Sequence, residues 1–315
     1  MNSEYLQAVI RQVLVDDLGL ILPHEHLFTD LRGPHVPDYA QADPDHVVRV
    51  MKPFLQQAEQ AGVTALVECS TVGVGRNIPV LQCLAEQTSI HLIAPTGVYR
   101  DAYVPKSLKE MSIAELAENW IGDIEIGMDG TGIRAGFIKL AVSDDGITPL
   151  EARNLQAAVI ASQRTGVVIA SHTIGGRLFQ DEIEILGSKG MDLQRFIWVH
   201  ANSEKDKRKH LEAARLGVFV EFDAIGADWQ SQEELLDFTL ELIEAGFSDH
   251  ILLSHDAGWY QPGSPGGSPE AGIRGFTDLV TEFIPKLHSL GVSENEVEII
   301  TQKNPARAFA IFKGA

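Results

Sequence analysis

The chain has 315 residues, of which 44% are hydrophobic and 22% are charged, and its formal net charge is −19. This length suits one large α/β barrel or two ordinary domains, and the composition is that of a globular protein with a sizeable core. The acidic balance argues against nucleic acid or an anionic membrane as a partner, since both require basic patches. No stretch approaches the ~18 apolar residues of a membrane span, the first residues carry no secretory signal, and Cys69 and Cys83 imply no disulfide framework. These features predict a soluble cytoplasmic protein.

Apolar β-type runs alternate with longer amphipathic runs along the whole chain. The strand candidates are 18–27, 64–70, 90–98, 135–142, 166–173, 196–201, 218–223 and 251–256. The helix candidates are 45–61, 78–87, 113–126, 149–164, 178–186, 204–216, 232–245, 273–287 and 305–312, with Ser203 as the expected cap of the sixth. Eight β/α pairs without a linker predict a single-domain (β/α)8 TIM barrel over residues 1–315. The alternative is a doubly wound open sheet, which would normally show fewer units and a Gly-rich first turn.

Polar side chains that can bind a metal occur at the ends of several predicted strands or within them. They are His24 and His26 (LILPHEHL), Lys139 (FIKLAV), His172 (IASHT), His200 (WVHAN) and Asp256 (SHDAG). Residues two apart on a strand share a face, so the first two histidines point the same way. The active site of such a barrel lies at the carboxyl ends of its strands. The pattern therefore predicts one metal site built from five strands.

The residue types indicate which metal this site binds. Imidazoles and a carboxylate without a thiolate favour Zn, with Co, Mn, Fe or Ni as alternatives. The ligands are too many for one tetrahedral ion and suit two divalent ions that share a bridging hydroxide. Lys139 is exceptional, because an ammonium between two dications would be repelled by both, so we expect a neutral amine. This amine is either a Schiff-base lysine or a group that is converted into an anionic ligand.

Longer stretches around these residues resemble a known family. PHEH, ECSTVGVGRN, TGVYRDAYVP, FIKLAV, SHT, VHAN, SHDAG and NPARAF together look like the phosphotriesterase family of the amidohydrolase superfamily, from about residue 17 to residue 312. The resemblance implies a more buried ion held by His24, His26 and Asp256, and a more exposed ion held by His172 and His200. It implies that Lys139 is an N6-carboxylysine bridging both ions, and that Asp256 accepts the proton of the attacking hydroxide. It also implies a homodimer.

The loops narrow the expected substrate. Tyr99 resembles a tyrosine of lactonase-like members that lies near the leaving group, which favours lactones over phosphotriesters. FDAIGADWQ departs from the arginine-bearing loop of acyl-homoserine lactonases. We expect Trp259 to wall the pocket, and an anionic sugar-type lactone would suit the cations of the catalytic-side loops, namely Arg76, Arg100, Lys205 and Arg274.

The prediction is therefore a hydrolase of small lactones with side activity on phosphotriesters. Three alternatives are kept: a phosphotriesterase as the main activity, a binding protein without turnover on the same barrel, and a Schiff-base lyase acting through Lys139. His255 has the opposite strand parity to Asp256, so it is expected behind the site and not in it.

Overall fold

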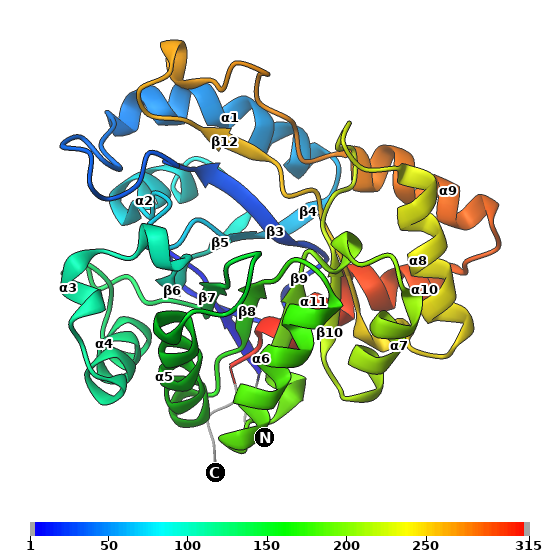
Figure 1. Ribbon diagram of the computed structural model, residues 1–315. Coiled ribbons are helices and arrows are strands. Elements are labelled where there is room, and N and C mark those ends of the chain that lie inside the picture. The colour runs from blue at the N-terminus through cyan, green and yellow to red at the C-terminus, as the bar shows by residue number, and fades with distance from the viewer. Residues whose placement is uncertain (1–3, 312–315) are drawn as a thin grey trace.

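The computed structural model describes residues 4–311 of the chain. Each predicted strand is present, and the third is split at Ala94 into β5 (His91–Ile93) and β6 (Pro95–Val98). The others are β3 (Leu20–Phe28), β4 (Val63–Glu68), β7 (Phe137–Ala141), β8 (Ile169–His172), β9 (Phe196–Val199), β10 (Phe219–Phe222) and β11 (Ile251–Leu253). Figure 1 shows these strands at the centre of the molecule with the helices around them.

The strands form a closed parallel barrel. Neighbours pair in the order β6-β7-β8-β9-β10-β11, and β3-β4-β5 pair on the other side. The gap between β11 and β3 is closed by hydrogen bonds from the His24 N–H to Ser254 Oγ at 3.0 Å and from the Asp256 N–H to the His24 carbonyl at 3.2 Å. This topology confirms the predicted (β/α)8 TIM barrel and excludes the open sheet.

Helices follow the strands and cover the outside of the barrel. They are α1 (Pro44–Gln60), α2 (Ile78–Ala85), α3 (Lys106–Lys109), α4 (Ile113–Glu125), α5 (Pro149–Thr165), α6 (Gly176–Ser188), α7 (Lys207–Arg215), α8 (Gln232–Glu244), α9 (Ile284–Ser289), α10 (Glu294–Glu298) and α11 (Asn304–Phe309). Local sequence decides where such a helix begins. At the start of α5, Thr148 and Glu151 form a reciprocal capping box around Pro149. Phe312, the predicted end of the last helix, lies outside the described residues.

Two predicted helix starts are wrong. The helix expected from residue 204 begins at Lys207, because Asp206 caps it while the Ser203 hydroxyl donates to the carbonyl of His200 instead. The helix expected from residue 273 begins later, as a π-helical turn over Leu279–Phe283 that continues into α9. The residues before it stay in a loop, where Arg274 donates to backbone carbonyls near Asp256. Both differences arise from contacts close to the strand ends.

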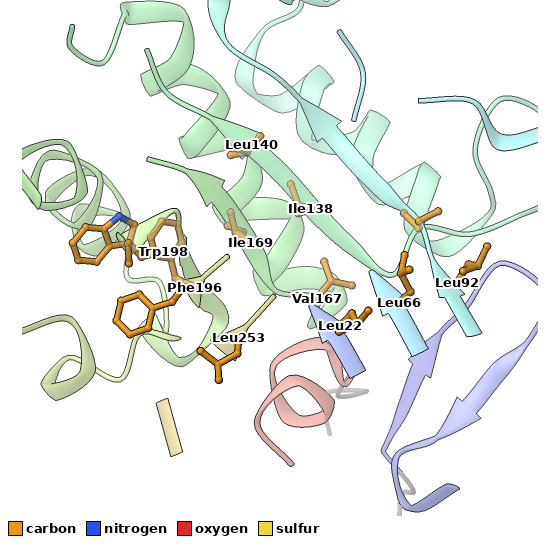
Figure 2. Close-up of a cluster of buried hydrophobic side chains, with 14 of the residues drawn as sticks. Leu22, Leu66, Leu92, Ile138, Leu140, Val167, Ile169, Phe196, Trp198 and Leu253 are labelled. Atoms are coloured by element: carbon orange, nitrogen blue, oxygen red, sulfur yellow. The ribbon is translucent and has the colours of Figure 1, made fainter. Parts of the chain in front are cut away.

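The strands alternate between two apolar layers. Side chains facing outward pack against the helices; ten of them are labelled in Figure 2, including Leu22, Leu66 and Trp198. Side chains of the opposite parity form a second cluster that includes Ile21, Phe137 and Leu252. Since Lys139 is two residues beyond Phe137, it shares the inward face. The alternation that fills the barrel thus also directs the polar strand ends inward.

Three short strands were not predicted. β1 (Tyr5–Gln7) and β2 (Gln12–Leu14) form an antiparallel hairpin, and β12 (Gly258–Tyr260) pairs with β3 immediately after Asp256. At three residues each, these strands are too short to show periodicity in the sequence. Among residues 4–311, no helix is both long and apolar enough to cross a membrane.

Candidate metal centre

A pocket of about 150 Å³ lies at the carboxyl ends of the strands. Its lining includes all six predicted ligands and both Tyr99 and Trp259; the complete set is His24, His26, Thr29, Leu31, Cys69, Val74, Tyr99, Lys139, His172, His200, Asp256 and Trp259. Arg274, the remaining predicted site residue, is absent from this lining. Its Nη2 donates to the carbonyls of His255 and Asp256, so it supports the wall from behind.

The two histidines of β3 converge on Asp256. Nε2 of His26 lies 3.0 Å and Nε2 of His24 lies 3.5 Å from the same oxygen, Oδ1 of Asp256. Their other ring nitrogens are already engaged: Nδ1 of His24 lies 2.7 Å from Oε1 of Glu221, and Nδ1 of His26 lies 2.7 Å from Oγ of Ser70. Each imidazole is therefore held by one nitrogen while the other faces the pocket.

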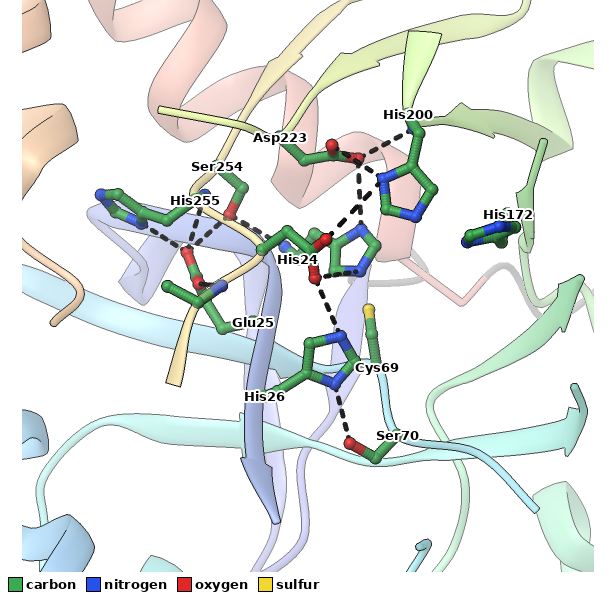
Figure 3. Close-up of polar contacts among 12 residues, drawn as sticks. His24, Glu25, His26, Cys69, Ser70, His172, His200, Asp223, Ser254 and His255 are labelled. Carbon is green, nitrogen blue, oxygen red and sulfur yellow. Dashed lines mark hydrogen bonds and ion pairs between the residues drawn. The ribbon is translucent and has the colours of Figure 1, made fainter. Parts of the chain in front are cut away.

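His200 is held in the same way. Its Nδ1 lies 2.8 Å from Oδ1 of Asp223, and its backbone N–H donates to Oδ2 of the same carboxylate. The backbone of His200 is left-handed, with φ of 61°, which is uncommon for a residue other than glycine. Figure 3 shows Asp223 between His200 and His24, with the ring of His172 beyond them. The ring centroids of His172 and His200 are 4.4 Å apart.

His172 has different partners. Nδ1 of His172 lies 3.4 Å from the Tyr99 hydroxyl, and Nη2 of Arg100 lies 2.6 Å from its Nε2. A guanidinium only donates hydrogen bonds, so Nε2 accepts here. Burial lowers the pKa of His172 well below its ordinary value, and the nearby charge of His200 lowers it further. His172 is thus a neutral imidazole with a lone pair, the form that binds a metal.

The backbone around Asp256 is fixed from two sides. Glu25 accepts hydrogen bonds from the N–H groups of His255 and Ala257, and its Oε1 lies 2.5 Å from Nδ1 of His255. Arg274 binds the carbonyls on the other side. Together they hold Asp256 in a left-handed conformation with φ of 48°. His255 lies behind the pocket, in the place expected from its parity, and its Nε2 accepts from the Leu279 N–H.

Neighbouring charged groups shift the pKa values of Asp256 and His24. Burial alone would raise the pKa of Asp256, but His24, His26 and His200 lower it below its ordinary range. Burial alone would lower the pKa of His24, but Cys69, Glu221 and Asp256 raise it well above its ordinary value. Asp256 is therefore an ionised carboxylate at neutral pH, able to bind a cation or accept a proton.

Lys139 is buried within the barrel, with 2% of its surface exposed. Among residues 4–311 its Nζ makes no hydrogen bond or ion pair, although buried lysines are almost always paired. Gly97 on β6 allows the backbone of Lys139 to lie close, because a Cβ there would overlap the Lys139 carbonyl oxygen. The close approach of β6 to the backbone of Lys139 thus depends on this glycine.

Glu221 and Asp223 contact two of the predicted ligands, and the sequence interpretation missed both. They stand two apart at the end of β10, and they orient His24 and His200 through the contacts given above. The same rule that found His24 and His26, namely polar residues two apart at a strand end, would have found them.

The arrangement fits divalent metal ions. His24, His200 and Asp256 offer ligand atoms within 4.8 Å of one another. Metal-binding histidines usually engage their second nitrogen with a carboxylate or another oxygen. His24, His26 and His200 do so here. A (β/α)8 barrel with such a ligand set at its strand ends is typical of a metal-dependent hydrolase.

Comparisons with known proteins identify the family. The model of the phosphotriesterase family matches residues 4–309, so the chain belongs to this family of binuclear metal-dependent hydrolases. The phosphotriesterase homology protein of Escherichia coli is 30% identical over 93% of this chain and 99% of its own. The N-acetyltaurine hydrolase of Danio rerio is 28% identical over 96% of this chain and 97% of its own.

A solved structure extends the comparison. A mutant of a phosphotriesterase-like lactonase from Deinococcus radiodurans superimposes with a TM-score of 0.87 and 30% identity, over 96% of this chain and 99% of the other. The resemblance inferred from the sequence is confirmed, and the chain is a hydrolase. A binding protein without turnover and a Schiff-base lyase are accordingly set aside.

Proposed function

We propose that this enzyme hydrolyses small lactones, with phosphotriesters as secondary substrates. The observation that carries the proposal is the position of Tyr99, whose hydroxyl lies 3.4 Å from Nδ1 of His172 in a pocket of about 150 Å³. A phenol beside the reacting centre can donate a hydrogen bond to the oxygen of an opening ring. Leu31, Val74 and Trp259 supply apolar surface for the ring carbons.

We infer that the chain holds two divalent ions, with Zn as the expected metal. His24, His26 and Asp256 would bind one ion, and His172 and His200 the other. When bound, such ions polarise a carbonyl or phosphoryl oxygen and make a water molecule acidic enough to attack it at neutral pH. Lys139 would bridge them as N6-carboxylysine, which also accounts for a buried amine without a carboxylate partner.

Side chains of the chain itself accept the proton, orient the ligands and limit the size of the substrate. Asp256, ionised and 3.0 Å from Nε2 of His26, is placed to accept the proton that leaves the attacking water. Asp223 and Glu221 keep His200 and His24 oriented. Trp259, whose ring centroid lies 5.8 Å from that of His26, limits how far a substrate can extend past this histidine.

The test is a comparison of three substrate classes on purified protein loaded with two equivalents of Zn. The panel contains γ- and δ-lactones, an aryl dialkyl phosphate, and N-acetyltaurine as an amide suggested by three relatives. We expect the highest kcat/KM for a lactone. A higher kcat/KM for the phosphate would make phosphotriester hydrolysis the main activity, and a preference for N-acetyltaurine would move the proposal to amides.

A further inference from the structure

We propose that Arg100 selects substrates that carry an anionic group, so that the lactone hydrolysed here bears a carboxylate. This inference rests on the proposed function and names its substrate class. Arg100 follows Tyr99 after β6, and its guanidinium carbon lies 5.4 Å from the centroid of the Tyr99 ring. The arginine is absent from the pocket lining, but it contacts two residues that line the pocket, Tyr99 and His172.

The guanidinium is only partly committed to other groups. Its Nη1 donates to Oδ2 of Asp144 at 2.8 Å and its Nη2 to Nε2 of His172 at 2.6 Å. Its Nε is buried and has no hydrogen-bond partner among residues 4–311. Asp144 is 46% exposed, and ion pairs with exposed carboxylates contribute little stability. Arg100 thus retains donor capacity beside the pocket.

The contact with His172 cannot persist when this histidine serves as a metal ligand. A neutral imidazole has one N–H and one lone pair, and a metal uses the lone pair. If Nε2 is the ligand atom, Nη2 of Arg100 lies on the side of the ring where the metal ion would bind. If Nδ1 is the ligand atom, Nε2 carries the proton and cannot accept a hydrogen bond. In either case Nη2 is released and becomes a donor for an incoming acceptor, next to the buried Nε of the same guanidinium.

The other cations of the catalytic-side loops have partners of their own. Arg76 pairs with Asp123 and Asp129, and Lys205 pairs with Glu234. Nη2 of Arg274 donates to backbone carbonyls, and its Nη1 is buried without a hydrogen-bond partner among residues 4–311. The net charge of −19 disfavours the approach of an anion, so a local arginine has a large effect on anion affinity. Charge-assisted hydrogen bonds from a guanidinium to a carboxylate are strong, and the released Nη2 of Arg100 supplies such a donor.

The first experiment compares γ-butyrolactone with its γ-carboxylate derivative in the Zn-loaded enzyme. In Arg100→Met we expect kcat/KM for the carboxylate to fall by about tenfold to a hundredfold, mainly through KM, with a change below about threefold for the neutral lactone. Arg100→Lys should restore part of the loss. Arg164→Met, which removes an exposed arginine paired with Glu118 on the outside of the barrel, is the charge-matched control.

A second readout does not depend on turnover. Calorimetry measures binding of cyclopentanecarboxylate and its neutral amide to the Zn-loaded proteins, and Arg100→Met should weaken only the carboxylate. Equal losses for both probes, or no loss for the carboxylate, would overturn the role of Arg100. If wild type hydrolyses no lactone, the proposed function fails, while the binding experiment still decides the role of Arg100.

Discussion

Asp223 holds His200 at two points, through Nδ1 of the ring at 2.8 Å and through the backbone N–H at 2.9 Å. One carboxylate therefore sets both the ring orientation of this histidine and its left-handed backbone. Because the ring nitrogen opposite Nδ1 faces the pocket, the position of a metal bound there depends on Asp223.

Asp223→Asn should weaken the binding of the more exposed ion by about tenfold to a hundredfold, because the amide holds the imidazole less firmly and makes it a weaker ligand. Competition with a chromogenic chelator measures this affinity. Asp237→Asn, which changes a carboxylate 60% exposed and paired with Lys207, is the control. An unchanged affinity in Asp223→Asn would show that Asp223 does not orient the ligand.

Lys139→Met should lose bound metal and activity together, since the variant lacks the group that we propose bridges both ions. Metal analysis of the purified variant measures the first loss, and short carboxylic acids added to it are expected to restore part of both. Lys189→Met, an exposed change after α6, is the matched control. Full metal content in Lys139→Met would exclude the bridging role.

Asp256→Asn should reduce turnover by about a hundredfold to ten-thousandfold, because the amide cannot accept a proton. Metal content is expected to fall less than turnover, as His24 and His26 remain in place. Steady-state kinetics with metal analysis on the same preparation separate the two effects. Wild-type turnover in this variant would remove Asp256 from proton transfer.

Glu182 on α6 predicts a pH dependence of folding stability. Burial raises its pKa from 4.5 to about 7, although hydrogen bonds from Ser171 and Thr173 oppose this rise. Between pH 4.5 and about pH 7, Glu182 is deprotonated in the unfolded chain and protonated in the folded protein. This contribution to stability is therefore complete below pH 4.5 and is lost as the pH rises through 7.

Glu182→Gln mimics the protonated side chain and should remove this dependence. The free energy of unfolding, measured in urea from pH 5 to pH 8, should show the variant more stable than wild type at the upper end and similar at the lower end. Glu184→Gln, an exposed change on the same helix, is the control. Parallel curves for Glu182→Gln and wild type would contradict the raised pKa.

The barrel and its pocket were predictable because they depend on local rules. Two-residue alternation places Phe137 and Lys139 on one face of β7, and it separates Asp256 in the pocket from His255 behind it. The β/α order implies a closed barrel, and closure brings the strand ends together. His24, His26, His172, His200 and Asp256 were found in this way.

The remaining features depend on contacts between distant segments. Arg100 was one of several loop cations in the sequence, and only the fold places it on His172. Arg274 was expected to contact substrate, but its side chain instead supports the backbone beside Asp256 from a loop that resembled a helix. By itself, the sequence determined the barrel and which side chains face its pocket, since periodicity is local. Tertiary structure decided how Glu221 and Asp223 orient those side chains and how Glu25 holds the backbone around Asp256, because hydrogen bonds between strands depend on distances that no local pattern encodes.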